Sequence, residues 1–581
     1  MDDSAAETKV EWREWGADAF ATAERAGKPV LLSLVAPWSE ECAEMDRTTY
    51  AEPRIAANVN DGFVPVRATV DRHPRVRDRY NMGGFPSTVF LTPGGTVITG
   101  ATYLGVDGFR EILDAVRRTW DGKGVEAGSV PRPLREAAPP GGELSARVEE
   151  HMIEQLLAAY DDEFGGWGSD VKFPMPRTIE FALVRARDQA TRTLEAVRTR
   201  LADTVDGGFF RFARNRDWSG TQHEKLVDEN AALLRAFAHG YRYTGEEAYR
   251  QTAEQTVEYL TTDLWTGEAV AASQGGAGGY YRLAATERAD AEAPTVDPTV
   301  FAGHNGVAVD ALLTYASYTD DERARRYAER ARDTLVDDLV GEDGAVVHYR
   351  DPERGETGAA GLLASQARTL AGLTTAGSVL GELGPARVVA DYAVDELRGG
   401  IDDEVATSES ATDEGEAAAG ESEEAESEEA ESEEAESAET AAFRDGPSEG
   451  PALLERPLYP LDSNAEMADA LVDCWLLTDD ERYREAAAGA LAAFAGATDR
   501  MGVELANYAT AVARLRDPRV VAVGAPAGSD LHRAALRLTD HETVVSPADG
   551  RAPDGEAVVL ADGDREGHAD SPAALESVLT D

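Results

Sequence analysis

The sequence predicts an α/β domain at the N-terminus, an all-α toroid of helical hairpins after it, and a small α/β appendage at the C-terminus. Three observations support this prediction. Apolar strand-like runs alternate with helical segments over residues 8–120, as in an α/β sandwich. Helical periodicity with an internal repeat follows over 143–515. Strand-like runs return over 516–581.

The first domain is predicted to contain buried strands and a closing helix. Residues 29–35 form a continuous apolar run, and 62–70 and 87–91 are rich in β-branched and aromatic residues. Residues 106–118 have helical periodicity and are expected to close the domain. The next stretch, 121–142, is rich in Pro and Gly and therefore predicts a linker.

An asparagine recurs through the helical region at a fixed distance from a threonine. Asn230, Asn305 and Asn464 are each followed fourteen residues later by Thr-x-x-Glu, with an apolar helical stretch between. The Thr-x-x-Glu spacing suits a capping box that begins a second helix. A weaker copy spans 366–397. Each unit is therefore a helical hairpin that must stack on its neighbours to bury its apolar stripe.

Paired glycines followed by an aromatic residue precede or link these hairpins. They occur at Gly165-Gly-Trp167, Gly207-Gly-Phe209 and Gly278-Gly-Tyr280. Glycine pairs permit tight turns, and the aromatic rings would line the mouth of a cavity. A straight helical solenoid is the competing architecture. We favour the toroid because a plain solenoid does not need such loops.

The charge balance is strongly acidic. The chain has 109 Asp and Glu residues against 56 Lys and Arg, a net charge of −53, and only five of its basic residues are lysines. Such a surface repels nucleic acid and anionic membranes, so neither is an expected partner. The acidic bias persists outside the low-complexity tract at 402–440, which predicts a salt-adapted protein rather than an ordinary acidic one. That tract itself is predicted to be a disordered surface insert in the toroid.

Neither a membrane helix nor a secretory signal is expected from the sequence. No apolar stretch approaches the length that a membrane-spanning helix needs, and the N-terminus is acidic. The expected location is therefore the cytoplasm. The chain has two cysteines, far apart in sequence, so neither a disulfide framework nor a cysteine-based zinc site is expected. No cofactor or metal motif stands out.

The segment Ala36-Pro-Trp-Ser-Glu-Glu-Cys-Ala-Glu-Met45 lies between a buried strand and a helix. With Gly84-Phe-Pro-Ser-Thr88, it resembles the active-site turn of thioredoxin and the facing loop with its cis-proline, here Pro86. Two thiols three residues apart exchange disulfides in that turn. Ser39 stands at the first position and only Cys42 remains, so dithiol reductase activity is not expected. Cys42 is then either a small buried packing residue or a monothiol group.

The layout of the chain resembles the spermatogenesis-associated protein 20 family, whose members combine a thioredoxin-like domain with a six-hairpin glycosidase-like domain. In their first motif, Cys-His-Trp-Cys-His-x-Met, the positions of the first cysteine, the second cysteine and the methionine are occupied here by Ser39, Cys42 and Met45. Their Asp-Arg pair and Gly-Gly-Trp-Pro before Val-Phe-Leu-Thr-Pro are similar to Asp71-Arg72 and Gly83-Gly-Phe-Pro86 before Val89-Phe-Leu-Thr-Pro93.

The second domain carries further matches to this family. Gly165-Gly-Trp-Gly-Ser169 with Lys172-Phe-Pro174 is similar to Gly-Gly-Phe-Gly-x-x-x-Lys-Phe-Pro. The family's His-Phe-Glu-Lys-Met-Leu-Tyr-Asp-Asn is similar to 222–230, which keeps Glu224, Lys225 and Asn230. Gln222 replaces the family histidine, which puts an acid–base role of that position in doubt.

Such toroids resemble glycoside hydrolases and sugar epimerases, whose acid–base chemistry needs paired carboxylates or histidines in a central funnel. We expect Glu224, Glu229 and His304 as catalytic candidates, with Asp228 beside them. The expected ligand-binding residues are Lys172, Arg211, Lys225, Asn230, Asn305 and Asn464, and the three asparagines are expected to ring one rim of the funnel. The structural alternative is that Glu224 and Lys225 form an ion pair that braces the helix and that His304 packs at a helix start.

Two functional hypotheses follow. In the first, the toroid binds or acts on a carbohydrate-like ligand, and the thioredoxin-like domain is a degenerate module. In the second, the protein is a monothiol redox or binding protein that contacts a protein partner through its thioredoxin face.

Overall fold

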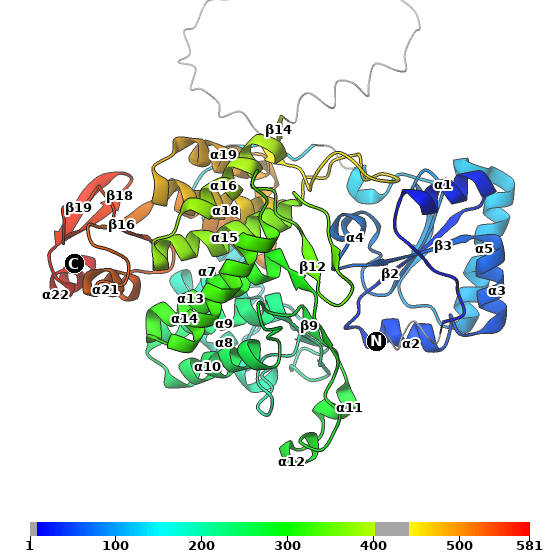
Figure 1. Ribbon diagram of the computed structural model, residues 1–581, viewed down its shortest axis with the longest axis horizontal. Coiled ribbons are helices and arrows are strands. Elements are labelled where there is room, and N and C mark those ends of the chain that lie inside the picture. The colour runs from blue at the N-terminus through cyan, green and yellow to red at the C-terminus, as the bar shows by residue number, and fades with distance from the viewer. Residues whose placement is uncertain (1–7, 136–137, 401–440, 581) are drawn as a thin grey trace, which may run out of the picture.

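The computed structural model describes residues 8–135, 138–400 and 441–580 (Figure 1). The predicted acidic insert at 402–440 lies outside the described residues.

The N-terminal domain has the thioredoxin-like fold that the sequence predicts. Its five strands lie in the order β1-β3-β2-β4-β5, with β2 parallel to β3 and antiparallel to β4. The strands are Arg13–Glu14, Val30–Val35, Val64–Thr69, Ser87–Leu91 and Val97–Ala101 for β1 to β5. Helices cover both faces of the sheet, namely α1 (Ala17–Ala26), α2 (Glu40–Arg47), α3 (Pro53–Gly62), α4 (Pro74–Tyr80) and α5 (Val106–Lys123). Strands β2 and β4 are almost wholly buried, which explains their continuous apolar sequence.

The helical region closes into a ring, so the predicted toroid is confirmed over the described residues. Each inner helix contacts the next, and the last returns to the first. The inner helices are α7 (Pro176–Arg185), α9 (Val227–Thr244), α13 (Ala302–Thr319), α15 (Leu363–Leu380), α18 (Leu461–Thr478) and α20 (Ala506–Arg516). The outer helices are α6 (Arg147–Ala158), α8 (Arg187–Arg200), α10 (Glu247–Thr262), α14 (Glu322–Thr334), α16 (Gly384–Tyr392) and α19 (Glu481–Ala492). A straight solenoid would not make the contact between α20 and α7.

Inner and outer helices differ in sequence for a physical reason. An inner helix such as α13 is buried over most of its length, because it packs on two neighbours and on its own outer helix. An outer helix such as α14 buries only Ala324, Ala328 and Ala331. Glycine lets α13 and α15 approach closely, since a Cβ at Gly306 would collide with the backbone of α15.

The predicted capping box is wrong. Thr244, Thr319 and Thr478 are the last residues of α9, α13 and α18, and each hydroxyl donates to the carbonyl four residues earlier. The following residue takes a left-handed conformation, and the next one begins the second helix; Asp321 caps α14 in this way. The threonine therefore closes the inner helix, and one left-handed residue separates it from the cap of the outer helix.

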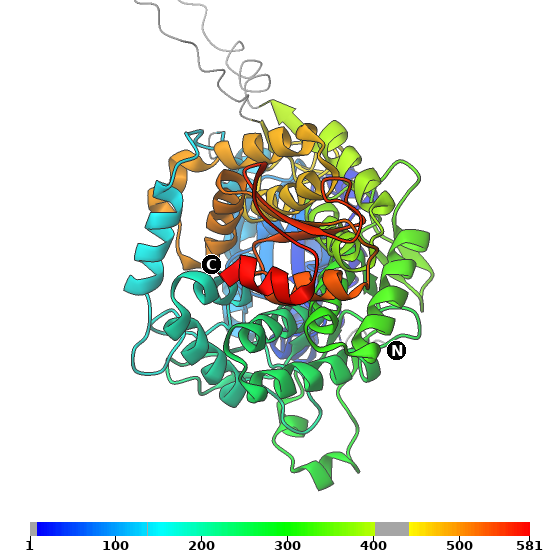
Figure 2. The ribbon, with the colours of Figure 1, turned by 90° about the vertical axis from the view of Figure 1, so that its left-hand side faces the viewer.

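Two small domains lie at opposite ends of the toroid axis. The C-terminal appendage is a four-stranded sheet in the order β17-β16-β18-β19, with α21 (Asp530–Leu538) and α22 (Pro572–Thr580). Its strands β16 to β19 are Arg519–Val523, Val544–Pro547, Ala557–Ala561 and Asp564–Ala569. Figure 2 looks along the axis, with the red appendage crossing the ring in front and the blue N-terminal sheet behind it. The appendage packs on α13, α15 and α18.

Short strands connect the hairpins at the end nearer the N-terminal domain. They are β6 (Phe212–Ala213) with β7 (Thr221–Gln222), β8 (Lys225–Leu226) with β9 (Ser273–Gln274) and β10 (Val296–Asp297), β11 (Val300–Phe301) with β12 (Tyr349–Asp351) and β13 (Glu356–Thr357), and β14 (Arg398–Gly400) with β15 (Ala441–Phe443). Gly278–Tyr281 forms the short helix α11 rather than the predicted turn, and with α12 (Ala285–Arg288) it makes an arm that projects from the ring (Figure 1). Among the described helices, none combines the length and apolarity that crossing a bilayer would need.

Candidate functional site

The thioredoxin-like loop holds a serine and a buried cysteine. Ser39 caps helix α2, and its hydroxyl accepts a hydrogen bond of 3.3 Å from the Cys42 backbone N–H. Cys42 is 6% exposed, and burial raises the pKa of its thiol to about 11. The thiol therefore stays protonated at neutral pH, which favours the packing interpretation over the monothiol one. Pro86 follows a cis peptide bond from Phe85, whose ring lies edge-on to Trp38.

The face that carries this loop is covered by the toroid. The Arg211 guanidinium stacks over Trp38 at 4.4 Å, the Glu41 carboxylate pairs with Arg214 at 2.9 Å, and Glu40 accepts from the Gly278 N–H at 2.9 Å. A protein partner at the thioredoxin face would first have to displace these contacts.

A buried ion-pair cluster fixes the two domains to each other. Arg75 and Arg79, from helix α4, both reach Asp445 in the loop before α18, at 2.9 and 2.6 Å. All three residues are buried. Arg72 pairs with Asp351 at 2.6 Å, and the His348 Nε2 lies 2.7 Å from the Asp71 carbonyl oxygen. The loop after β3 is thus embedded in the end of the toroid.

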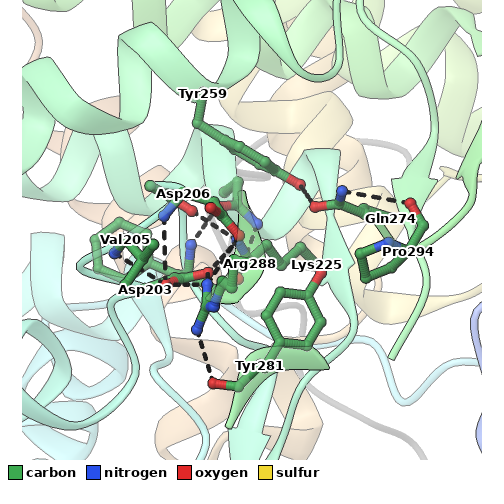
Figure 3. Close-up of polar contacts among 12 residues, drawn as sticks. Asp203, Val205, Asp206, Lys225, Tyr259, Gln274, Tyr281, Arg288 and Pro294 are labelled. Atoms are coloured by element: carbon green, nitrogen blue, oxygen red, sulfur yellow. Dashed lines mark hydrogen bonds and ion pairs between the residues drawn. The ribbon is translucent and has the colours of Figure 1, made fainter. Parts of the chain in front are cut away.

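The two predicted ligand-binding lysines lie inside structural networks. Lys225 is fully buried; its ammonium donates to Asp203 at 2.8 Å and to the Gly207 carbonyl at 2.7 Å. Figure 3 shows Asp203 shared with Arg288, and Tyr259 and Tyr281 flanking the lysine. Lys172 repeats the arrangement one hairpin earlier, with Asp161 and the Gly168 carbonyl. Both lysines therefore brace a Gly-Gly turn, and this geometry gives a ligand no free ammonium group to bind.

The three recurring asparagines act as clamps. The amide oxygen of Asn230 accepts from the Phe209 N–H, and its amide nitrogen donates to the carbonyls of Phe209 and Leu226. Asn305 does the same with Val270 and Phe301, and Asn464 with Phe443 and Pro460. The amides hold loops to inner helices instead of pointing into the axis, because the loop backbone needs these hydrogen bonds. The equal spacing thus marks a structural device.

Two predicted carboxylates flank Arg211 at the covered end. The Arg211 Nη1 lies 3.6 Å from Glu224 Oε1, and its Nε lies 3.4 Å from Glu229 Oε1. Burial raises the pKa of Glu224, and Arg211 opposes that change. Burial likewise raises the pKa of Glu229 to about 8, again against Arg211 and with a contribution from the negative charge of Asp228. The second oxygen of Glu229, Oε2, is buried and has no hydrogen-bond partner among the described residues.

His304 lies in the first turn of α13, close to Asp228. Its Nε2 is 3.8 Å from Asp228 Oδ2, and its Nδ1 is buried without a partner in the described part of the chain. Asp71 of the thioredoxin-like domain accepts from the Trp38 indole at 2.9 Å. Burial raises the pKa of Asp71, while the nearby His304 and the indole hydrogen bond lower it. The structure therefore brings Glu224, Glu229 and His304 to the same end of the axis.

The side chains at this covered end are only partly buried. The side chains of Arg211, Asp228, Glu229 and His304 keep 24%, 27%, 30% and 19% of their surface accessible. Sequence reasoning missed Asp71 and Trp38 as parts of the site, because they belong to a different domain. It also missed Arg368 of α15, which pairs with Glu466 at 2.9 Å and lies 3.7 Å from Asp228. A single Arg in a helical repeat carries no sequence signal of that role.

The axis also contains cavities that no sequence motif indicated. A small one lies beside Arg368 and Glu466, and a larger one of about 160 Å³ lies under the appendage. Both are lined by charged residues of the inner helices, among them Arg177, Arg235 and Asp310. The described residues do not gather three His, Cys, Asp or Glu side chains as a metal site would require.

Comparison with known proteins finds similarities for both parts of the chain. The family model described as "Protein of unknown function, DUF255", of the Thioredox_DsbH type, matches residues 3–131. The thiol:disulfide interchange protein DsbD 1 of Pseudomonas aeruginosa is 30% identical over 103 residues, which is 17% of each chain. Among solved structures, a D-mannose isomerase covers 64% of this chain and 98% of its own, with 12% identity and a TM-score of 0.45.

Human spermatogenesis-associated protein 20 is 26% identical over 292 residues, which is 44% of this chain. The match spans only 37% of the human protein, so the activity of the whole relative does not transfer to this chain. The family resemblance predicted from the motifs is confirmed to this extent: spermatogenesis-associated protein 20 is a homologue of this chain.

Proposed function

We propose that the toroid binds a small carbohydrate-like ligand at the end covered by the thioredoxin-like domain, and that Glu229 and His304 exchange protons with it. The thioredoxin-like domain is then a fixed roof over the site, without dithiol chemistry. Glycan and sugar chemistry of this kind uses pairs of acid and base groups with separated pKa values.

One observation carries the proposal. Glu229 Oε2 and His304 Nδ1 are both buried and lack hydrogen-bond partners in the described structure, and both residues flank Asp228. Buried polar atoms without partners are costly, and such groups occur at functional sites more often than elsewhere. A hydroxyl group both donates and accepts, so adjacent hydroxyls of one ligand satisfy a carboxyl oxygen and a ring nitrogen together.

The surrounding residues suit the same role. With a pKa of about 8, Glu229 is mostly protonated at pH 7 and serves as the acid, while Asp228, whose pKa the nearby His304 and Arg368 lower against burial, stays ionised. Arg211 is held between Glu224 and Glu229 and stacks on Trp38, which fixes its N–H groups for contact with oxygen atoms.

The test is saturation-transfer NMR of the full-length protein with free D-mannose and D-glucose, combined with chromatography for conversion. We expect binding that weakens as pH rises through about 8, because Glu229 then loses the proton that it donates. Glu229→Gln and His304→Gln should each reduce binding or conversion at least tenfold without lowering Tm. Glu258→Gln, on an exposed part of α10, is the matched control. Binding of neither sugar, or binding that both variants leave unchanged, would contradict the proposal.

A further inference from the structure

The larger axial cavity lies at the opposite end of the toroid from Glu229, and its lining includes none of Arg211, Asp228, Glu229 and His304. The inner helices form its walls, and the appendage forms its roof with residues such as Thr539, His541 and Val545. Its volume is about 160 Å³. Since one water needs roughly 10–15 Å³ of cavity volume, the cavity has room for on the order of ten heavy atoms.

Most of the charge in the cavity wall is internally paired. Arg235 bridges Glu180 and Asp310, and Arg514 bridges Asp469 and Asp473. The four carboxylates come from α7, α13 and α18, so these two arginines tie together helices around the ring. Burial raises the pKa of Glu180 to about 8 and those of Asp310 and Asp473 to about 6. Partial protonation therefore brings the wall close to neutrality, and a strongly charged ligand gains little there.

Three polar groups in the wall remain without adequate partners. His541 is the first. Its Nδ1 lies 2.8 Å from the Tyr243 hydroxyl, which also accepts from the His541 backbone N–H. The hydroxyl proton then points at Nδ1, which places the ring proton on Nε2. That Nε2 is buried and has no partner within the described ranges. Burial lowers the pKa of His541 to about 3, so the ring is neutral.

Asn507 and Arg177 are the other two. The Asn507 side chain lines both axial cavities and makes no hydrogen bond to any described residue. Arg177, at the start of α7, makes a single side-chain contact, from Nη1 to Glu180 at 3.4 Å, and its other N–H groups are unpaired in the described structure. These groups come from α7, α20 and the appendage and meet at one cavity.

We propose that this cavity is a second binding site, for a small uncharged molecule with several adjacent hydroxyl groups, held by Arg177, Asn507 and His541. Arg177 and His541 offer N–H donors, and the Asn507 amide offers a donor and an acceptor. The ionised carboxylates of the cavity wall accept hydroxyl protons through the lone pairs that the arginines leave free. A polyol meets both needs, whereas an anion lacks protons for the carboxylates and an ammonium compound lacks acceptors for the arginine and histidine. The site does not depend on the proposed acid–base function at the other end.

The probe is methyl α-D-glucopyranoside, a sugar derivative without a free reducing end, titrated into the full-length protein by calorimetry. Citrate and ethanolamine are the anionic and cationic comparison compounds. Asn507→Leu and His541→Phe remove one polar group each. Neither side chain is in an ion pair, and the phenyl ring that His541→Phe introduces keeps the ring stack on His239. We expect binding of the pyranoside alone and a loss of at least fivefold in affinity for each variant.

Matched controls separate the site from general effects. Asn58→Leu and His568→Phe make the same changes at exposed positions in α3 and β19 and should leave affinity unchanged. Glu229→Gln identifies any pyranoside bound at the covered end, where the proposed function also places a carbohydrate-like ligand. Tighter binding of citrate or ethanolamine, or equal affinity in the two cavity variants and wild type with unaltered Tm, would overturn the proposal. Loss of pyranoside binding in Glu229→Gln alone would assign the ligand to the covered end instead.

Discussion

The two ends of the toroid axis are closed in different ways. At one end, the thioredoxin-like domain is fixed by buried ion pairs between Arg75, Arg79 and Asp445. At the other, the appendage is held by the bidentate ion pair of Arg185 with Glu542, by the exposed pair of Arg537 with Asp320, and by hydrogen bonds such as Ser378 to the Val545 carbonyl. The difference teaches that two buried arginines sharing one carboxylate fix the thioredoxin-like domain to the toroid, whereas the appendage roofs a cavity of about 160 Å³.

We expect the largest loss of stability when the charge of Asp445 is removed. Asp445→Asn leaves two buried arginines without their counter-ion, and breaking such a pair costs about 3–5 kcal/mol. Denaturant unfolding followed by tryptophan fluorescence measures the loss, since Trp38 lies in the same interface.

Asp479→Asn is the control, because Asp479 is exposed at the end of α18 and asparagine also tolerates its left-handed backbone. We expect a change within about 0.5 kcal/mol there. Equal small losses for both variants would show that the domain rests loosely on the toroid.

A smaller effect concerns redox activity. The wild type should not reduce insulin, because Ser39 replaces the nucleophilic thiol and Cys42 is buried. Ser39→Cys supplies the missing thiol, but the toroid covers the loop, so we expect only slow reduction. Combining it with Asp445→Asn should increase the rate by loosening the cover. Rapid insulin reduction by Ser39→Cys alone, or any robust insulin reduction by the wild type, would contradict a rigid contact between the two domains.

Much of the fold followed from the sequence, and the reasons are local. Continuous apolar strands such as 30–35 are buried on both faces, and their pattern shows it. The asparagine repeat marked α9, α13 and α18 because each of these inner helices clamps its preceding loop with that asparagine. The capping box failed because the same Thr-x-x-Glu letters also fit a helix end followed by a turn.

The site was predictable only in part. The positions of Glu229 and His304 followed from the recurring asparagines beside them, which mark the start of inner helices. The sequence motif around Lys172 and Lys225 did not distinguish two possibilities. A buried lysine that braces a turn and a lysine that binds a ligand share that motif. Asp71 joins the site by contact between domains, and Arg177, Asn507 and His541 meet only after the ring closes. Such contacts depend on tertiary structure and produce no regular residue spacing in the sequence.

The most direct test of the covered-end site is the pKa of Glu229. Selective ¹³C labelling of glutamate carboxyl groups, with Glu229→Gln to assign the signal, gives this value by NMR titration. The structure predicts a pKa of about 8, raised by burial from the ordinary 4.5. The native state then binds this proton more tightly than the unfolded chain, so wild type should lose stability relative to Glu229→Gln as pH rises from about 4.5 to about 8. Titration near 4.5, with no such loss, would contradict the acid–base role of the site.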